Sequence, residues 1–383
     1  MRFLTAGESH GKALVGIIDQ YPSGVEIDID FINKELERRQ RGFGRSKRMD
    51  IEKDQVEIIS GMRKGKTTGS PISFMISNKD WENWEEKLEV EPDLVNPRPG
   101  HADLAGLLKY NLDSIRDVIE RSSARETASR VCTGAFARIA LKLVGINIFS
   151  YVEQIGNVIF NEEIDTRSND LDWELIKKIE GSEVRCPDEK VSARMKEAII
   201  KAREYGDTLG GKFKVIAKGL IPGLGSYTQW DLRLDAKIAT ALISIPAIKA
   251  VEIGDGFNSA NCKGTDFHDE YYFDKKIGIY RKTNRAGGLE GGMTNGMPIV
   301  VGATMKPIPT TKKGLKSVNI KTKESASSLS ERADICAVPS AAAVGEAMLA
   351  IEILNAVQDK FGRDNIEEIL KAYNIYKKYV KEI

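Results

Sequence analysis

Two of the three histidines in this 383-residue chain lie where a side chain could exchange protons with a ligand. His10 lies in AGESHGKA and His101 in NPRPGHAD, so glycine and polar residues flank both. A buried structural histidine usually lies inside an apolar element, and this pattern instead predicts loop histidines that line a cleft. Histidine changes charge near neutral pH, so both are candidates for proton transfer. His268, in the acidic and aromatic stretch DFHDEYY, is predicted to be a surface residue.

An arginine-rich segment is the second group of candidates. Its members are Arg38, Arg39, Arg41, Arg45 and Arg48. Guanidinium groups bind phosphate and carboxylate in a bidentate manner. Gly42 and Gly44 would let the backbone come close to a ligand. The pattern indicates an anion site, and a solvated basic loop is the alternative.

Two further segments carry charged or polar residues next to predicted helices. Arg121, Ser122 and Ser123 precede a helix that would begin at Ala124 with the capping box SARE, and a helix N-terminus suits a phosphate. An ordinary cap is the alternative, and both can hold together. In ERADICAVPSAAAVGEAM, Arg332 and Asp334 precede a small-residue run that enters a helix. Asp334 is an acid/base candidate only if it faces a cleft, since an Asp beside an Arg is most often an ion pair.

The elements that must position these residues alternate irregularly. Strands are predicted at 2–5, 13–18, 56–60, 71–77 and 212–217, and helices at 31–39 (N-cap Asp30), 124–143, 173–179, 192–204, 231–243, 340–361 and 366–380. Residues 79–100 are charged and end in NPRPG, which predicts a surface excursion, and residues 287–302 form a Gly-rich centre. No repeat or linker divides the chain. The pattern indicates an α+β sandwich, and we expect one domain over residues 1–383.

Composition limits the class of protein. Lys+Arg is 57 and Asp+Glu is 56, and this balance argues against a general nucleic-acid binder. The four cysteines lie far apart, which favours reduced thiols over a metal site or a disulfide framework. No stretch is expected to be long and apolar enough to span a bilayer, and the N-terminus turns polar at once. We therefore expect a cytoplasmic protein.

Two motif-like stretches do not support a nucleotide site. SGMRKGKT at 60–67 resembles a P-loop, but Ser60 replaces the first glycine and Gly69 and Pro71 make the required helix improbable. Residues 254–259 begin like G-x-G-x-x-G but end in Ser259, with no apolar helical pattern after it. From the residues alone, the chain is a soluble enzyme with an arginine-lined anion cleft and two histidines, and its substrate stays open.

The same segments resemble the chorismate synthase family. The similar blocks are AGESHGKALVGIIDQYPSG, RRQRGFGRSKRM, RPGHADLAGLLKY, ERSSARETASRVCTGAFAR, SIPAIKAVEIGDGF, AGGLEGGMTNGMPIVVGATMKPIPT and RADICAVPSAAAVGEAMLA, in family order from residue 1 to about residue 355. Ala250 and Glu120 stand where glycine is frequent in the family, and neither position has a role in the resemblance.

The resemblance implies a single-domain β-α-β sandwich, assembled as a homotetramer. It also implies an anti-1,4-elimination of phosphate from 5-enolpyruvylshikimate 3-phosphate to give chorismate, the last common step of the shikimate pathway. The reaction has no net redox change but needs reduced FMN. This cofactor would supply the difficult chemistry, and the protein would orient it.

Residue roles are also implied by the resemblance. His10 would stabilise or protonate the departing phosphate, His101 would protonate the reduced flavin or hold a proton for it, and Asp334 would help relay the ring proton. The implied FMN contacts are Arg121, Ser122, Ser123, Pro246, Ala247, Gly291, Lys306, Pro307, Ile308, Pro309, Thr310 and Arg332. The implied contacts to the phosphate of substrate or NADPH are Ser9, Arg39, Arg45 and Arg48, and no metal is implied.

Three alternatives stay open at this stage. Arg39 and Arg45 could serve substrate or NADPH, and nothing beyond the family core indicates a flavin reductase within the chain, so an external reductase is expected. A phosphotransferase using residues 60–67 would turn over ATP. A non-catalytic nucleic-acid binder using the arginine segment would show steeply salt-dependent binding.

Overall fold

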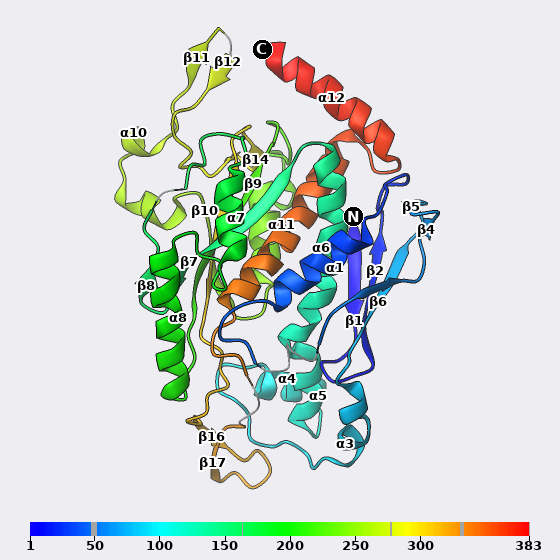
Figure 1. Cartoon of the computed structure of the whole chain (residues 1–383), viewed down its shortest axis with the longest axis vertical. Coiled ribbons are helices and arrows are strands. Elements are labelled where there is room, and N and C mark those ends of the chain that lie inside the picture. Colours follow the sequence, from blue (N-terminus) through cyan, green and yellow to red (C-terminus); the bar gives the residue numbers. More distant parts are fainter. Residues whose placement is uncertain (47–51, 163, 276–277, 330–332, 383) are drawn as a thin grey trace.

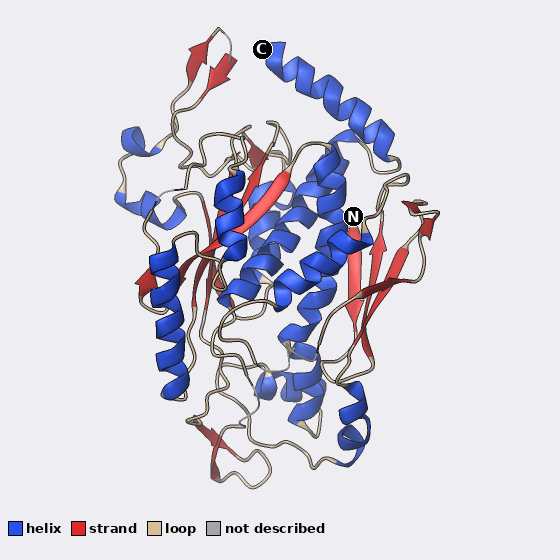
Figure 2. Cartoon of the chain, in the orientation of Figure 1, coloured by secondary structure: helices blue, strands red, loops and turns tan. Residues whose placement is uncertain are grey.

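Two antiparallel β-sheets enclose a layer of helices (Figures 1 and 2). The computed structural model describes residues 1–46, 52–162, 164–275, 278–329 and 333–382. Its sheets pack on opposite sides of the helices, so the predicted α+β class and β-α-β sandwich are confirmed. The first sheet has one face on the core, so burial alternates along β2 and β6, whereas β7 and β15 of the second sheet are buried almost continuously.

The first sheet has the order β1 (Arg2–Ala6), β2 (Ala13–Asp19), β6 (Ile72–Ser77), β3 (Val56–Ile58). On β2, Leu14 and Ile18 are fully buried, whereas Ile17 is 45% exposed. This alternation fixes which face packs on the helices. The loop between β1 and β2 carries His10 and emerges at the end of this sheet.

The second sheet has the order β10 (Ile248–Ile253), β15 (Ile299–Met305), β9 (Gly211–Lys218), β7 (Asn147–Ile155), β8 (Val158–Ile159). β15 pairs with β9 in continuous register from Ile299 opposite Ala217 to Met305 opposite Gly211. The segment predicted only as a Gly-rich centre therefore contains a central strand, preceded by the hairpin of β13 (Leu289–Glu290) and β14 (Met293–Thr294).

The helical layer consists of α1 (Ile29–Gln40), α6 (Thr127–Leu143), α9 (Leu234–Ile243) and α11 (Val338–Phe361). Small residues let α6 and α11 approach closely, since a Cβ on Gly134 would lie 2.3 Å from the Cβ of Ala347. By length and composition α11 is long and apolar enough to cross a membrane, so the expectation that no stretch reaches this length was wrong. However, 89% of the apolar 18-residue stretch of α11 is buried inside the fold, as expected for a core helix.

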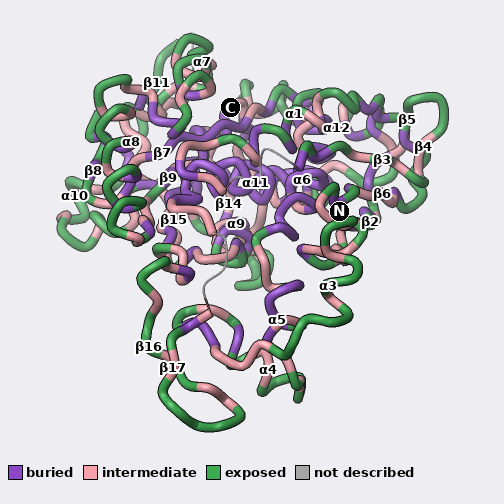
Figure 3. The backbone as a smooth tube through the Cα atoms, turned by 60° about the horizontal axis from the view of Figure 1, so that its bottom comes forward, coloured by how far each residue is buried: buried purple, intermediate pink, exposed green. Residues whose placement is uncertain are grey.

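A third region lies below the sandwich in Figure 1. It contains η1 (Trp81–Asn83), α3 (Glu85–Val90), α4 (Asp103–Tyr110), α5 (Ile115–Ser122) and the hairpin of β16 (Lys316–Val318) and β17 (Ser325–Ser327). Figure 3 shows that it is much less buried than the sandwich. This region is built from two stretches of chain that lie far apart in the sequence. Backbone hydrogen bonds from the Ile320 N–H to the Val95 carbonyl and from the Leu329 N–H to the Asn96 carbonyl join them.

The remaining elements lie around the sandwich. α7 (Trp173–Gly181) and α8 (Glu189–Glu204) lie beside the second sheet, with η4 (Gly256–Asn261) and α10 (Gly264–Phe267) nearby (Figure 1). The hairpin of β11 (Tyr272–Asp274) and β12 (Gly278–Tyr280) and the helix α12 (Ile366–Glu382) project at one end, and η3 (Trp230–Leu232) precedes α9.

The predicted helices are present, but the residues that cap two of their N-termini differ from those predicted. Asp28, not Asp30, caps α1 by accepting from the Phe31 N–H at 2.9 Å. Ser123 caps a short 3-10 helix, η2 (Ala124–Glu126), and Glu126 pairs with Arg130 instead of completing the predicted capping box. The P-loop-like segment forms a hairpin of β4 (Met62–Arg63) and β5 (Lys66–Thr67) with no helix after it, which confirms its rejection.

Candidate functional site

The loop between β1 and β2 holds His10 against α5. Glu120 accepts two hydrogen bonds from this one residue, from Nδ1 at 2.9 Å and from the backbone N–H at 2.7 Å. The backbone N–H of Ser9 donates to the Glu120 carbonyl at 2.9 Å. Burial alone would raise the pKa of Glu120, but the hydrogen bonds and charge of His10 and the charge of Arg116 hold it below its ordinary value. Glu120 is therefore a carboxylate at neutral pH.

Trp84 covers the other side of His10. The two ring centroids lie 4.0 Å apart with an interplanar angle of 32°. Arg116 lies over the same indole at 5.4 Å and pairs with Glu91 at 2.8 Å. Residues 79–100, predicted as a surface excursion, thus supply a direct contact to a candidate catalytic side chain, and that interpretation was incomplete.

His101 is held in a similar way by a carboxylate from α4. Its Nδ1 contacts Oδ1 of Asp103, which is fully buried. Arg98 donates to Asp103 through its backbone N–H at 2.9 Å, Nε at 2.9 Å and Nη2 at 3.0 Å. Burial would raise the pKa of Asp103, but the hydrogen bonds from His101 and Arg98 hold it well below its ordinary value. The sequence offered a signal here, since Asp103 follows His101 by two positions.

Arg39 enters a buried cluster between α1 and α6. Asp54 accepts from Arg39 Nη2 at 2.9 Å and from Arg125 Nη1 at 2.6 Å. Burial, with the nearby charges of Arg125 and Arg45, lowers the pKa of Arg39 to about 10 despite Asp54, so it stays cationic at neutral pH. Among the described residues, Arg39 Nε is buried without a hydrogen-bond partner, and Arg125 Nη2 has no hydrogen bond but lies 3.6 Å from Glu52 Oε2 in an ion pair. Spare donors on buried cations suit an anionic ligand, and Arg125 was not predicted.

Asp334 faces the arginine segment. Its carboxylate pairs with Arg45 Nη1 at 2.7 Å and accepts from the backbone N–H of Ser46 at 2.7 Å. Asp334 therefore forms an ion pair, as the alternative interpretation of the sequence allowed. The arginine that it pairs with is Arg45, which lies in a distant part of the chain. Arg48 and Arg332 lie outside the described residues.

Hydrogen bonds connect these groups into two sets. Asn78 donates to the carbonyls of Glu8 and Gly11 beside His10 and accepts from Arg125 Nε at 2.9 Å. It therefore ties the His10 loop to the Arg39 cluster. On the other side, Arg98 donates to Thr310 Oγ1 at 3.1 Å, which ties the His101 loop to residues 306–310.

Most of the predicted flavin contacts gather beside His101. The Lys306 backbone N–H donates to the Ala247 carbonyl at 3.0 Å, and Lys306 Nζ contacts the Gly100 carbonyl. Ala247 has a φ of +68°, which is strained for a residue with a side chain. Such strain is often found at ligand sites. The predicted set of Pro246, Ala247 and residues 306–310 therefore forms one surface with the His101 loop.

The other predicted flavin contacts, at the end of α5 and at Gly291, do not lie together on one surface. Arg121 is exposed and donates to the carbonyl of Thr5 at 2.8 Å and to that of Gly7 at 3.2 Å, so it supports the His10 loop. The buried hydroxyl of Ser122 has no hydrogen-bond partner among the described residues. Gly291 lies apart: it is in the β13–β14 turn, at the start of α9, whereas Pro246 follows the end of α9.

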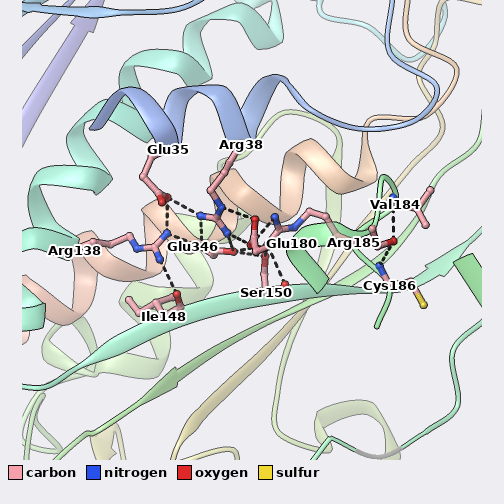
Figure 4. A network of polar contacts seen from close by, with 11 residues as sticks. Glu35, Arg38, Arg138, Ile148, Ser150, Glu180, Val184, Arg185, Cys186 and Glu346 are labelled. Carbon is pink, nitrogen blue, oxygen red and sulfur yellow. Dashed lines mark hydrogen bonds and ion pairs between the residues drawn. The ribbon is translucent and has the colours of Figure 1, made fainter. Parts of the chain in front are cut away.

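Not every arginine of the predicted anion segment faces this region. Arg41 is exposed and pairs with Glu37, as a solvated residue would. Arg38 points into the helical layer, where it, Arg138 and Arg185 converge on the fully buried Glu346 (Figure 4). Arg38 and Arg41 thus pair with carboxylates away from this region, and the anion site stays a prediction for Arg39 and Arg45.

A cavity of about 610 Å³ lies elsewhere in the described part of the chain. It lies beside α8, and Arg194, Lys201, Thr208 and Lys313 are among its lining residues. None of the predicted site residues lines it. Its charged side chains are exposed and paired, Lys201 with Glu197 and Lys313 with Asp207, so its size alone does not make it the site.

Two buried carboxylates that orient histidines, beside arginines with spare donors, define an α+β enzyme that acts on an anionic small molecule. The sequence model of the family described as chorismate synthase matches residues 1–358. The chain therefore belongs to the chorismate synthase family.

Individual relatives agree with this family. A chorismate synthase from Alkaliphilus metalliredigens is 52% identical over 381 residues, which cover 98% of this chain and 99% of the relative. One from Sulfurihydrogenibium is 52% identical over 389 residues, with 99% of each chain covered. A crystal structure of a chorismate synthase superposes with a TM-score of 0.82 at 42% identity, over 100% of this chain and 98% of that one.

Proposed function

We propose that this chain converts 5-enolpyruvylshikimate 3-phosphate to chorismate and phosphate by an anti-1,4-elimination that depends on reduced FMN. The carbon–oxygen lyase class and the place in aromatic amino acid biosynthesis follow from family membership. The observation that carries the residue assignment is the pair of histidines, His10 and His101, each held through Nδ1 by a buried carboxylate. Such carboxylates orient imidazoles for proton transfer.

The elimination removes phosphate and a ring proton, and we assign the proton transfers to three residues. His10 stabilises or protonates the departing phosphate oxygen. His101 holds a proton for the reduced flavin. Asp334, kept in place by Arg45 and the Ser46 N–H, assists the transfer of the ring proton. Well-placed proton transfer contributes roughly 10²–10⁴-fold.

The residues beside His101 fit a flat ring with a phosphate tail. The unpartnered Ser122 hydroxyl and the strained backbone of Ala247 are the structural features that support this fit. The residues that would hold FMN are Arg121, Ser122, Ser123, Pro246, Ala247, Lys306–Thr310 and Arg332. Gly291 lies apart from these residues in the fold, so only the family resemblance supports its contact with FMN. When bound, reduced FMN would lend an electron transiently and help take the ring proton at N5.

The anionic groups of the substrate would bind at the arginine cluster. We assign them to Ser9, Arg39, Arg45 and Arg48, and the spare buried donor on Arg39 supports this assignment. Cations at these positions neutralise the departing phosphate, which lowers the barrier to its loss. Arg39 and Arg45 would instead meet NADPH if the chain reduces its own flavin.

The proposal extends to the setting of the enzyme. We propose a single catalytic domain over residues 1–383 in a homotetramer, located in the cytoplasm, with a small-molecule substrate and without nucleic-acid, membrane or metal partners. An external reductase would supply the reduced flavin, with NADPH as the ultimate reductant.

An anaerobic assay tests the function. Purified protein is mixed with 5-enolpyruvylshikimate 3-phosphate and chemically reduced FMN, and chorismate absorbance and phosphate release are followed. A parallel assay uses oxidised FMN with NADPH. Product only with pre-reduced flavin supports the lyase with an external reductase, and product in both assigns flavin reduction to the chain. Folded, FMN-binding protein that gives no product in either would contradict the proposal.

A further inference from the structure

Glu120 occupies a position to which the family resemblance gives no role, yet it accepts three hydrogen bonds from the His10 loop. Its carboxylate accepts from Nδ1 and the backbone N–H of His10, and its carbonyl accepts from the Ser9 N–H. Only 6% of Glu120 is exposed, so these bonds are shielded from water. Three bonds to two consecutive residues leave the loop little rotational freedom.

The protonation state of Glu120 decides which nitrogen of His10 carries hydrogen. An ionised carboxylate can only accept hydrogen bonds. The pKa of Glu120 is held below its ordinary value, so at neutral pH Nδ1 of His10 must be the donor. The backbone bond to Oε2 fixes the orientation of the same carboxylate, because Oε1 is then the oxygen left for the ring.

Proton exchange with a ligand then falls to Nε2, because Nδ1 is bound to Glu120. Trp84 packs on the ring at 4.0 Å and so limits rotation about the side chain. In the neutral ring Nε2 is an acceptor, and in the imidazolium it is a donor.

We infer that Glu120 is a positioning residue, which keeps hydrogen on Nδ1 of His10 and presents Nε2 to the departing phosphate. The inference rests on the role of His10 in the proposed function. As the C–O bond breaks, its electron pair stays on the phosphate oxygen, and Nε2 gives that oxygen its proton. The ring is left neutral with hydrogen on Nδ1, and the proton on Nε2 is regained from solvent.

The test reads the tautomer of His10 directly. With three histidines in the chain, ¹⁵N-labelled imidazoles can be resolved and His10 assigned by comparison with His10→Ala. At a pH where the ring is neutral, we expect the Nδ1–H form in the wild type and mainly the Nε2–H form in Glu120→Ala. Glu91→Gln is the matched control, because it removes a nearby carboxylate that pairs with Arg116. It should keep the Nδ1–H form.

Activity completes the test, with the holoenzyme and reduced FMN. Glu120→Ala should lower kcat by roughly 10²-fold, Glu120→Asp should recover part of it, and Glu91→Gln should be near wild type. If Glu120→Ala does not fold, Glu120→Gln serves, because its amide oxygen can replace only one of the two acceptors and should give a mixture of tautomers. Retention of the Nδ1–H form, or a changed tautomer with wild-type kcat, would overturn the inference. If the wild type itself makes no chorismate, the proposed function has failed, and the tautomer still decides whether Glu120 positions His10.

Discussion

Arg38 and Arg39 are neighbours on α1, yet their guanidinium groups enter two different buried clusters. Arg38 pairs with Glu346 of α11 at 2.9 Å, and Arg39 pairs with Asp54 at 2.9 Å. Successive residues of a helix point about 100° apart, so α1 connects a structural network to the candidate site. The Glu346 network fixes α1, and α1 in turn places Arg39.

Glu346→Gln should therefore reduce stability strongly. Arg38, Arg138 and Arg185 all pair with Glu346, and Ser150 donates to it at 2.6 Å (Figure 4). Breaking a buried ion network by removing one charge costs about 3–5 kcal/mol. Urea unfolding at neutral pH measures this. Glu37→Gln, which removes the exposed partner of Arg41, should cost under about 1 kcal/mol.

Glu346 should also make the free energy of unfolding depend on pH in the acidic range. Burial would raise the pKa of Glu346, but the three arginines lower it from its usual 4.5 to about 2. A depressed folded pKa gives stability that is present above pH 4.5 and is lost as pH falls toward 2. In that window the wild type should lose stability more steeply than Glu346→Gln. Parallel curves for the two proteins would show that Glu346 is not the titrating group.

Arg39→Lys should weaken substrate binding. Lysine keeps the charge but not the fork of donors that reaches both Asp54 and a ligand. A hydrogen bond to a charged group contributes about 1.5–3 kcal/mol, so we expect KM to rise roughly 10- to 100-fold. Steady-state kinetics with saturating reduced FMN measures this. Arg41→Ala, in the exposed part of the same segment, is the control, and an unchanged KM in Arg39→Lys would remove Arg39 from the substrate site.

His101→Ala should keep FMN binding and lose most turnover. The loop contacts to Thr310 and Lys306 come from Arg98 and the Gly100 carbonyl, so the flavin-side surface survives without the imidazole. We expect a loss of roughly 10²–10⁴-fold in kcat. FMN titration and turnover are measured on the same preparation, with the exposed His268→Ala as control. A wild-type rate would exclude His101 from the mechanism.

The sequence was sufficient for element types and for the two histidine loops, because these depend on local signals. Glycine and polar neighbours marked His10 and His101, and apolar periodicity marked α6 and α11. β7 was not predicted, because its sequence NIFSYVEQI does not alternate apolar and polar residues, although most of the strand is buried.

The partners of the catalytic candidates were largely beyond local reasoning. Glu120 is 110 positions from His10, and Asp334 is 288 positions from the Ser46 N–H that it accepts from. Only the folded sandwich brings such residues together. The opposite directions of Arg38 and Arg39 had the same cause, because the buried acids that attract them come from distant elements.

Asp103→Asn should impair both turnover and FMN binding, whereas His101→Ala should impair turnover alone. Asp103 holds both His101 and Arg98, and Arg98 reaches Thr310 in the proposed flavin loop. An amide cannot accept from all of these donors, so the tautomer of His101 and the flavin surface should both suffer. We expect kcat to fall about 10²-fold together with weaker FMN binding in a fluorescence titration. Asp93→Asn, which removes the exposed partner of Lys321 in the same segment, should change neither. Wild-type FMN affinity in Asp103→Asn would mean that Arg98 does not need Asp103 to support the flavin loop.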